Sequence, residues 1–242
     1  MTMRKTCATS NLHSEVDRLK GVYREYGERG WGRTKWAVTN RGNQAIRRER
    51  NRKLQRLLRS ADFLPLGDRR VLDVGCGSGE ALAGFEAWGA RPENLWGVDL
   101  LHERVRRARE NFPTLNFREA NGEALPFDDE QFDLVLAFTV FTSILDSRMA
   151  QKVVREMARV LRSGGAVVWY DFRVSNPFNP HVKGLSHRDI RRLFPGFHIS
   201  LIAVTLIPQL ARRCGPLTNL FYPRLAALPF LRSHYLGLLI KP

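Results

Sequence analysis

Hydrophobic residues follow two different patterns along this chain, and from residue 71 onward the two patterns alternate. Short apolar runs predict buried strands at 71–75, 95–99, 115–120, 132–138 and 166–172. Apolar residues spaced three or four positions apart predict helices at 80–88, 101–112 and 148–161. The pair Gly164 and Gly165 predicts the C-terminal cap of the last helix. Strands that alternate with helices in this way predict a doubly wound α/β fold with a mostly parallel sheet.

The two ends of the chain add elements of a different kind. Residues 12–26 and 44–60 have the apolar spacing of helices, and a loop rich in Gly and Trp separates them. Two further strands are predicted at 197–207 and 234–240, and we expect them to pair antiparallel at one edge. The prediction is therefore a seven-stranded Rossmann-like sheet with an antiparallel edge and an N-terminal helical extension. We divide the chain into a helical lid and a cofactor-binding domain, residues 1–62 and 63–242.

Composition predicts an ordered protein and argues against disulfide-rich, metal-binding, secreted and membrane-spanning classes. The 242 residues are 43% hydrophobic and 10% aromatic, which is enough apolar material for a core. Three cysteines give neither a disulfide framework nor metal-ligand spacing, so we expect a reducing compartment and no metal. The N-terminal residues lack the apolar segment of a signal peptide, and no run of about 18 apolar residues occurs. We therefore expect a cytoplasmic protein, with peripheral association at a membrane as an alternative.

The net charge of +15 is unevenly distributed along the chain. The middle, 71–170, is mildly acidic, whereas both flanks are strongly basic. Attraction to an anionic partner would therefore come from the flanks rather than from the predicted sheet. The run RRERNRK at 47–53 fits two interpretations, a solvated helix face or a surface that faces an anion.

The stretch VLDVGCGSGE places a glycine-rich turn between a strand and a helix, a geometry that binds nucleotides. No Lys follows the glycines, so the turn does not fit a phosphate-binding P-loop. Glu80 replaces the third glycine of a dinucleotide fingerprint, and its carboxylate would repel a pyrophosphate. A ligand with a cationic, amino-acid-like end fits better, because Asp73 and Glu80 flank the turn. Asp99 ends the next strand, where a carboxylate can accept hydrogen bonds from both ribose hydroxyls.

Four motifs in order resemble the class I S-adenosylmethionine-dependent methyltransferases: VLDVGCGSGE, LWGVDL, ANGEALPFDDEQFDLVLAF and VVREMARVLRSGGAVVWYDF. The resemblance implies S-adenosylmethionine as the cofactor and S-adenosylhomocysteine as its product. It departs at Asn121, where the family often has Asp, although the Asn carbonyl can still accept a hydrogen bond from the adenine amino group. The turn and the resemblance together predict these cofactor-binding residues: Asp73, Gly75, Cys76, Gly77, Gly79, Asp99, Leu100, Asn121, Gly122, Glu123 and Phe138.

A hydroxyl acceptor would need a base that takes its proton during the transfer. We expect this base to be Asp171, near the end of a predicted strand, or His181, in the following loop. Structural roles are the competing interpretation, with Asp171 orienting a loop and His181 at the surface. The segment WGRTKWAVTNRGN is richer in Trp, Gly and Asn than a plain linker, so it supplies the predicted acceptor residues Trp31, Trp36, Asn40 and Asn43.

Three classes of function stay open at this point. We prefer methyl transfer to oxygen or nitrogen of a small-molecule acceptor or of a glycan-, phosphate- or lipid-linked one. The basic flanks favour an RNA methyltransferase as the alternative, although AFTV stands where base N-methylation uses an aromatic-proline motif. The third class is a cofactor-binding protein without activity. The apolar segment 214–235 fits either packing beneath the last two strands or an interfacial surface for anionic lipid.

Overall fold

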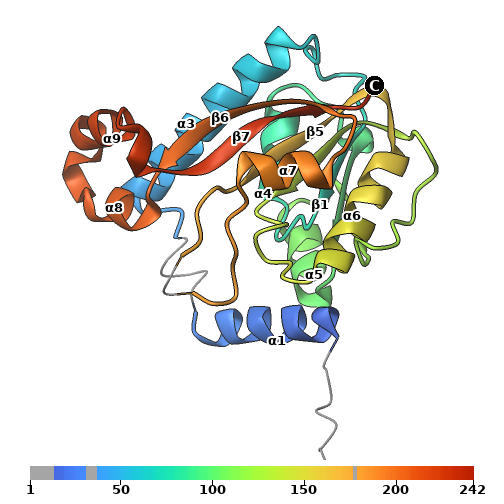
Figure 1. The fold of residues 1–242 in the computed structure, drawn as a ribbon, viewed down its shortest axis with the longest axis horizontal. Helices are drawn as coiled ribbons and strands as arrows, with labels where there is room; N and C mark the ends of the chain where they lie inside the picture. The colour runs from blue at the N-terminus through green and yellow to red at the C-terminus, as the bar shows by residue number, and fades with distance from the viewer. Residues whose placement is uncertain (1–13, 31–36, 177–178) are drawn as a thin grey trace, which may run out of the picture.

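In the described part of the chain, seven strands form one sheet with helices on both faces (Figure 1). The computed structural model describes residues 14–30, 37–176 and 179–242. The strands are β1 Val71–Val74, β2 Leu95–Asp99, β3 Asn116–Glu119, β4 Phe132–Phe138, β5 Leu161–Phe172, β6 His198–Leu206 and β7 Arg232–Ile240. Their order is β3-β2-β1-β4-β5-β7-β6, with the first five parallel and β7 antiparallel to both of its neighbours. The predicted sheet and its antiparallel edge are confirmed.

Helices cover the two faces of the sheet, and each face has its own core. The helices are α1 Glu15–Glu28, α3 Arg41–Ser60, α4 Glu80–Ala87, α5 His102–Asn111, α6 Ser147–Val160, α7 His187–Leu193, α8 Pro208–Arg213 and α9 Thr218–Ala226, with 3-10 turns η1 Pro92–Asn94, η2 Gly215–Leu217 and η3 Pro229–Leu231. On one face, Leu54 and Leu58 of α3 pack with α4, α5 and the strands. On the other face, Met157 of α6 and Ile190 of α7 pack around Trp169.

The predicted glycine cap of α6 is wrong. The helix ends at Val160, where the N–H of Leu161 bonds to the Met157 carbonyl, and β5 begins at once. Gly165 lies inside β5, where a Cβ atom would stand 2.9 Å from the carbonyl oxygen of Asp133. The glycine is therefore needed for the close approach of two strands and not for ending a helix.

The basic helix α3 is an integral part of the structure on one face of the sheet. Leu54 and Leu58 are fully buried there, whereas Arg52 and Arg56 on the opposite side of the helix are exposed. The amino end of α3 packs against α8 so closely that a Cβ atom on Gly42 would meet the Ala211 backbone. The predicted domain boundary at residue 62 stays a prediction. The helix α3 lies before that boundary, but it packs into the core of the predicted cofactor-binding domain.

Between β6 and β7, residues 208–231 form a small helical lobe beside the start of α3, at the left of Figure 1. Tyr222 and Ala226 of α9 are buried in its own small core with Ala45. Five apolar side chains of the lobe nevertheless remain exposed: Leu217, Leu220, Phe221, Leu228 and Phe230. Part of the segment thus packs, as one of the two interpretations expected, and part faces solvent. No described helix is both long and apolar enough to cross a membrane.

Candidate cofactor and acceptor site

The glycine turn joins β1 to α4 at the carboxyl edge of the parallel strands. Gly75, Gly77 and Gly79 all have positive φ angles, which side chains rarely tolerate. The N–H groups of Gly75 and Cys76 donate to the carbonyl of Val98, at 2.8 and 2.9 Å, so the turn is tied to β2. A Cβ atom on Gly79 would stand 2.8 Å from Phe112 and Phe117, whereas one on Gly77 would meet nothing within 4 Å. The turn therefore offers bare backbone to open space at Gly77.

Asp99 at the end of β2 connects this turn to the second strand. Its Oδ2 accepts a hydrogen bond from the Gly77 N–H, and its Oδ1 accepts one from the Leu101 N–H, both at 3.0 Å. Arg104 Nη1 lies 3.8 Å from Oδ2. The carboxylate is thus fixed by backbone donors while it lines a cavity, and its contact with a ribose stays a prediction.

Asp73 in β1 is a buried carboxyl with an unused acceptor. Its side chain is 2% exposed, and Oδ1 has no hydrogen-bond partner in the described structure. Burial first, and then the nearby Asp99, raise the pKa of Asp73 to about 8, while Arg50 acts in the opposite direction. An orphaned carboxyl oxygen beside an open glycine turn fits the ammonium end of an amino-acid-like ligand.

A cavity opens along the carboxyl ends of β1, β2 and β4 and is lined by residues from both sides. Six of the predicted cofactor residues line it: Gly75, Asp99, Leu100, Asn121, Gly122 and Phe138. The other five, Asp73, Cys76, Gly77, Gly79 and Glu123, lie in or next to the same segments without lining it. Asn121 folds back on its own loop, since its Oδ1 accepts from the Glu123 N–H at 3.0 Å and its Nδ2 donates to the Glu123 carboxylate.

The helix α1 contributes a wall that the motif pattern did not reveal. Leu19 and Tyr23 line the cavity from α1, within the segment predicted to form a helical lid, although no motif had singled out these two residues. Tyr23 Oη lies 2.8 Å from Ser143 Oγ, and Arg18 donates to the Ser143 carbonyl at 2.6 Å. Glu15 accepts a hydrogen bond from the Leu145 N–H. These bonds hold α1 against the loop that follows β4.

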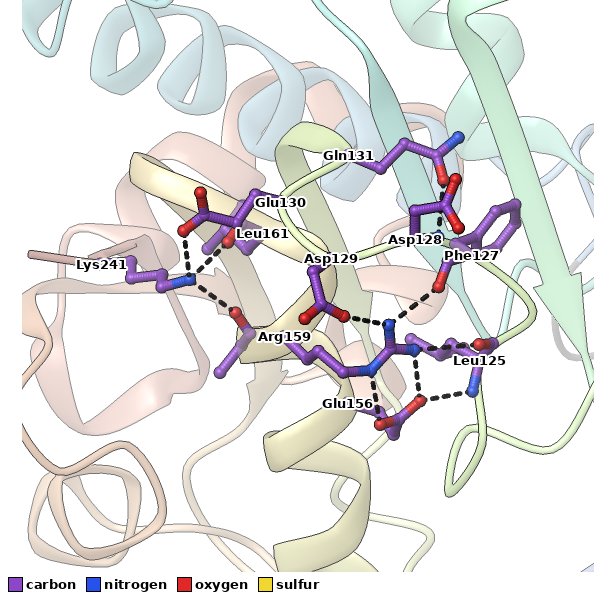
Figure 2. A network of polar contacts seen from close by, with 11 residues as sticks. Leu125, Phe127, Asp128, Asp129, Glu130, Gln131, Glu156, Arg159, Leu161 and Lys241 are labelled. Carbon is purple, nitrogen blue, oxygen red and sulfur yellow. Dashed lines mark hydrogen bonds and ion pairs between the residues drawn. The ribbon is translucent and has the colours of Figure 1, made fainter.

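Arg159 of α6 fixes the loop that leads from the cavity into β4 (Figure 2). Its guanidinium donates to the carbonyls of Leu125 and Phe127, at 3.0 and 2.8 Å, and to Asp129 at 2.7 Å. Glu156 accepts from Arg159 and also from the Leu125 N–H. Hydrogen bonds from Arg159 are the largest cause that lowers the pKa of Glu156. The loop carrying the predicted adenine segment is therefore ordered by a charged network rather than by apolar packing alone.

The two predicted bases occupy positions without direct contact with the cavity. Asp171 is fully buried, and its carboxylate accepts from the N–H groups of Thr142 and Phe172 at 3.0 and 2.8 Å. Burial raises the pKa of Asp171 to about 6, although the hydrogen bonds from Thr142 lower it. His181 is half-buried in the loop after β5, where its N–H donates to Asn179 Oδ1. Neither lines the cavity, so their catalytic role stays a prediction.

Of the predicted acceptor residues, Trp31 and Trp36 lie outside the described residues. Asn40 is the N-cap of α3, with its side chain accepting from the Asn43 N–H at 3.1 Å. Asn43 is buried and donates from Nδ2 to the Ala37 carbonyl at 3.0 Å. Asn40 thus caps α3 and Asn43 ties the start of the helix to the preceding residues, while the contact of either with an acceptor stays a prediction.

Sequence reasoning also missed Arg50 of α3. Its guanidinium carbon lies 5.0 Å from the ring centroid of Phe138, which lines the cavity. The signal was present in the spacing, because Arg50 stands four residues after Ile46 and four before Leu54, inside the apolar stripe of the helix. A cation within such a stripe has to point inward.

With this geometry in view, comparison with known proteins identifies the central part of the chain. The sequence model described as "Methyltransferase domain" matches residues 72–169, which contain the glycine turn and Asp99. These residues belong to the methyltransferase domain family. The predicted family is therefore confirmed for the segment that carries the cofactor motifs.

Solved structures share the fold of the S-adenosylmethionine-dependent class I methyltransferases. Magnesium protoporphyrin IX methyltransferase from Synechocystis, solved with bound S-adenosylmethionine, has a TM-score of 0.63 at 15% identity and covers 96% of this chain and 100% of its own. The [4+2]-cyclase SpnF has a TM-score of 0.59 at 18% identity and covers 79% and 81%. Because a cyclase shares the fold, the fold alone does not determine the activity.

Several curated relatives are methyltransferases named for lipid acceptors. A phthiotriol/phenolphthiotriol dimycocerosates methyltransferase of Mycobacterium ulcerans is 34% identical over 137 residues, 56% of this chain and 49% of the relative. A fatty-acid O-methyltransferase of Mycolicibacterium smegmatis is 39% identical over 43% of this chain and 38% of the relative. A phosphatidylethanolamine N-methyltransferase of Cereibacter sphaeroides is 37% identical over 41% and 48%. The chain spans about half the length of such relatives or less.

Proposed function

We propose that this chain transfers the methyl group of S-adenosylmethionine to an oxygen or nitrogen of a lipid-type acceptor. Three features at the carboxyl edge of the sheet support the cofactor half of this proposal: the open glycine turn, the unpartnered oxygen of Asp73 and the placement of Asp99. The names of the curated relatives support the acceptor half. The observation that carries the acceptor class is an exposed apolar surface on a lobe without acidic residues.

When bound, S-adenosylmethionine supplies an electrophilic methyl group on a sulfonium sulfur. The protein has to hold the acceptor nucleophile in line with that group and exclude water. Val140, Ile144 and Met149 line the cavity with apolar side chains and are suited to excluding water. A carboxylate acceptor would need no base, whereas a hydroxyl would. Asp171 and His181 are our proposed bases for a hydroxyl acceptor.

The lobe surface consists of the five exposed apolar residues of the segment 215–231. They are 41% to 75% exposed, with Phe230 at the upper limit: Leu217, Leu220, Phe221, Leu228 and Phe230. A large group of exposed apolar side chains on a folded protein is typical of a surface that binds another protein or a membrane. Leu217 ends η2, Leu220 and Phe221 belong to α9, and Leu228 and Phe230 lie just before and within η3.

Arginines lie in the lobe or contact it from α3, and residues 208–231 contain no Asp or Glu. Arg41 and Arg48 reach the lobe from α3, since Arg41 donates to the Pro216 carbonyl and Arg48 to Asn219 Oδ1. Arg213 and Arg224 are exposed within the lobe itself. Apolar side chains flanked by cations suit the headgroup region of an anionic bilayer, where each cation contributes about 1 kcal/mol. We infer peripheral binding at such a surface.

Vesicle sedimentation tests this part of the proposal. The protein should sediment at low salt with vesicles that contain phosphatidylglycerol and stay in the supernatant with neutral phosphatidylcholine vesicles. The double variant Phe221→Asp/Phe230→Asp should lose sedimentation and keep its thermal unfolding midpoint. Ile202→Asp, which changes an exposed apolar residue on β6, is the matched control and should sediment like the wild type. Sedimentation that is unchanged in the double variant, or steep salt-dependent binding to RNA in its place, contradicts the proposal.

A further inference from the structure

Arg50 brings a positive charge from α3 to the carboxyl edge of the sheet. Its guanidinium carbon lies 5.0 Å from the Phe138 ring centroid and 5.4 Å from the Tyr170 ring centroid. Phe138 ends β4, next to the strand that carries the glycine turn, and lines the cavity. The guanidinium therefore packs against two aromatic side chains, whose ring centroids are 5.8 Å apart, at the edge where the cofactor motifs converge.

This cation has no anionic partner among the described residues. Its one hydrogen bond there runs from Nε to Asn51 Oδ1 at 3.1 Å, and no carboxylate lies within ion-pair distance. Burial lowers the pKa of Arg50, and neighbouring Arg47 acts in the same direction. Arg50 is half-buried, and a partly desolvated guanidinium is stabilised by a carboxylate or phosphate partner that restores the hydrogen bonds lost from water. Both Nη groups are available for such an anion.

The buried carboxyl group of Asp73 influences Arg50 electrostatically and has no ion-pair partner among the described residues. Asp73 has a buried Oδ1 without a partner, and Arg50 and Asp73 each shift the pKa of the other. The two side chains nevertheless do not form an ion pair with each other. A cation and a nearby carboxyl group that do not pair with each other match the carboxylate and ammonium of an α-amino acid, and the bound ammonium would favour the ionised form of Asp73. The methionine end of S-adenosylmethionine has this chemistry.

We infer that Arg50 binds the carboxylate of the cofactor's methionine end, with Asp73 facing the ammonium group. The inference rests on the cofactor of the proposed function and not on its acceptor. The planar guanidinium can donate two parallel hydrogen bonds to one carboxylate, which a lysine cannot reproduce. Arg50 thereby selects ligands that carry an intact amino-acid end over nucleosides that lack it.

A carboxylate could also come from the acceptor, because one of the relatives is named for fatty acids. Ligands that differ only at the amino-acid end separate the two sources. Isothermal calorimetry can compare S-adenosylhomocysteine with its decarboxylated analogue and with methylthioadenosine, which lacks the amino-acid end altogether. None of these measurements requires an acceptor or a membrane, so the result does not depend on the lipid half of the proposed function.

Arg50→Met should weaken binding of S-adenosylhomocysteine by about 10- to 100-fold, the range expected for lost charge-assisted hydrogen bonds. The same variant should bind methylthioadenosine and the decarboxylated analogue as the wild type does. Arg50→Lys should retain part of the affinity for S-adenosylhomocysteine. Arg52→Met, which removes an exposed arginine from the same helix, should change none of these affinities.

Two results would overturn the inference. One is an unchanged affinity of Arg50→Met for S-adenosylhomocysteine, including the case in which only the KM of a fatty-acid acceptor rises. The other is an equal loss for all three ligands, which would make Arg50 a purely structural residue. A comparison on the wild type alone covers the case in which the variants fail to fold. There S-adenosylhomocysteine should bind at least about tenfold more tightly than the decarboxylated analogue, and equal affinities refute the role of Arg50.

Discussion

The guanidinium of Arg104 lies over the ring of Tyr23, with its central carbon 4.0 Å from the ring centroid. Tyr23 belongs to α1 and Arg104 to α5, so this contact joins the N-terminal helix to the wall that carries Asp99. Through its hydroxyl, Tyr23 also reaches Ser143 on the other side of the cavity. The helix α1 is thereby attached to both walls of the cavity that we assign to the cofactor.

Removing this attachment should weaken cofactor binding. Tyr23→Ala loses the cation–π contact with Arg104 and the bond to Ser143, which together should reduce affinity for S-adenosylhomocysteine about three- to tenfold. Tyr23→Phe keeps the ring over Arg104 and should lose less than half of that effect in free energy. Calorimetry with S-adenosylhomocysteine measures whether affinity falls from the wild type to Tyr23→Phe and then to Tyr23→Ala. Equal affinity in the wild type and Tyr23→Ala would mean that α1 does not contribute to the site.

Asp99→Ala should reduce affinity for S-adenosylmethionine by about 1.5–3 kcal/mol, because charge-assisted hydrogen bonds to the ribose are lost. The structure adds a second cost, since the Gly77 and Leu101 N–H groups lose their acceptor. Asp99→Asn leaves one carbonyl oxygen as an acceptor, so its affinity for S-adenosylmethionine should lie between those of the wild type and Asp99→Ala. Unchanged calorimetric affinity in Asp99→Ala would remove Asp99 from the ribose site.

The two neighbouring glycines should respond differently to a side chain. Gly77→Val should abolish cofactor binding while the fold is largely kept, because its side chain enters open space and the cost to folding is limited to the strained positive φ. Gly79→Ala should instead lower the free energy of unfolding, since its Cβ atom would stand 2.8 Å from Phe112 and Phe117. Urea denaturation and calorimetry on both variants separate these effects. If Gly77→Val binds the cofactor normally, the turn is not its cradle.

The pH dependence of stability should report on Asp73. Burial raises its pKa to about 8 in the folded protein, against 3.8 as the ordinary value. Between these two values the unfolded chain carries the charge and the folded protein does not, so the wild type loses stability as pH rises from about 4 to 8. Asp73→Asn cannot ionise at this position, so its free energy of unfolding should rise relative to that of the wild type as the pH increases across this window. Urea denaturation at several pH values measures the difference, and parallel curves would contradict the raised pKa.

The sheet could be predicted because buried parallel strands consist of nearly continuous apolar residues, as FDLVLAF at 132–138 illustrates. The cap at Gly164 and Gly165 could not, since a glycine required for helix ending and one required for strand contact look the same in sequence. Arg50 was hidden for a related reason. Its neighbours Arg48 and Arg52 are exposed cations, and only the position within the apolar stripe distinguishes it from them.

Tertiary contacts also decide what the individual polar residues do. Asp171 is fully buried and accepts hydrogen bonds from the loop after β4, and no local pattern distinguishes this from a catalytic carboxylate. Asn40 caps α3, a role that its place before a helical run could have indicated. Tyr23 lines the cavity because α1 folds across the sheet edge, which the spacing within α1 does not reveal.

Transfer of labelled methyl groups tests the central claim most directly. The protein should be incubated with methyl-labelled S-adenosylmethionine, anionic vesicles containing a bacterial lipid extract, total RNA and a pool of soluble metabolites, each separately and in combination. The account predicts label in the chloroform-extractable lipid fraction, and loss of that label in Asp99→Ala. Label that appears in RNA or in soluble metabolites while the lipid fraction stays unlabelled would contradict it.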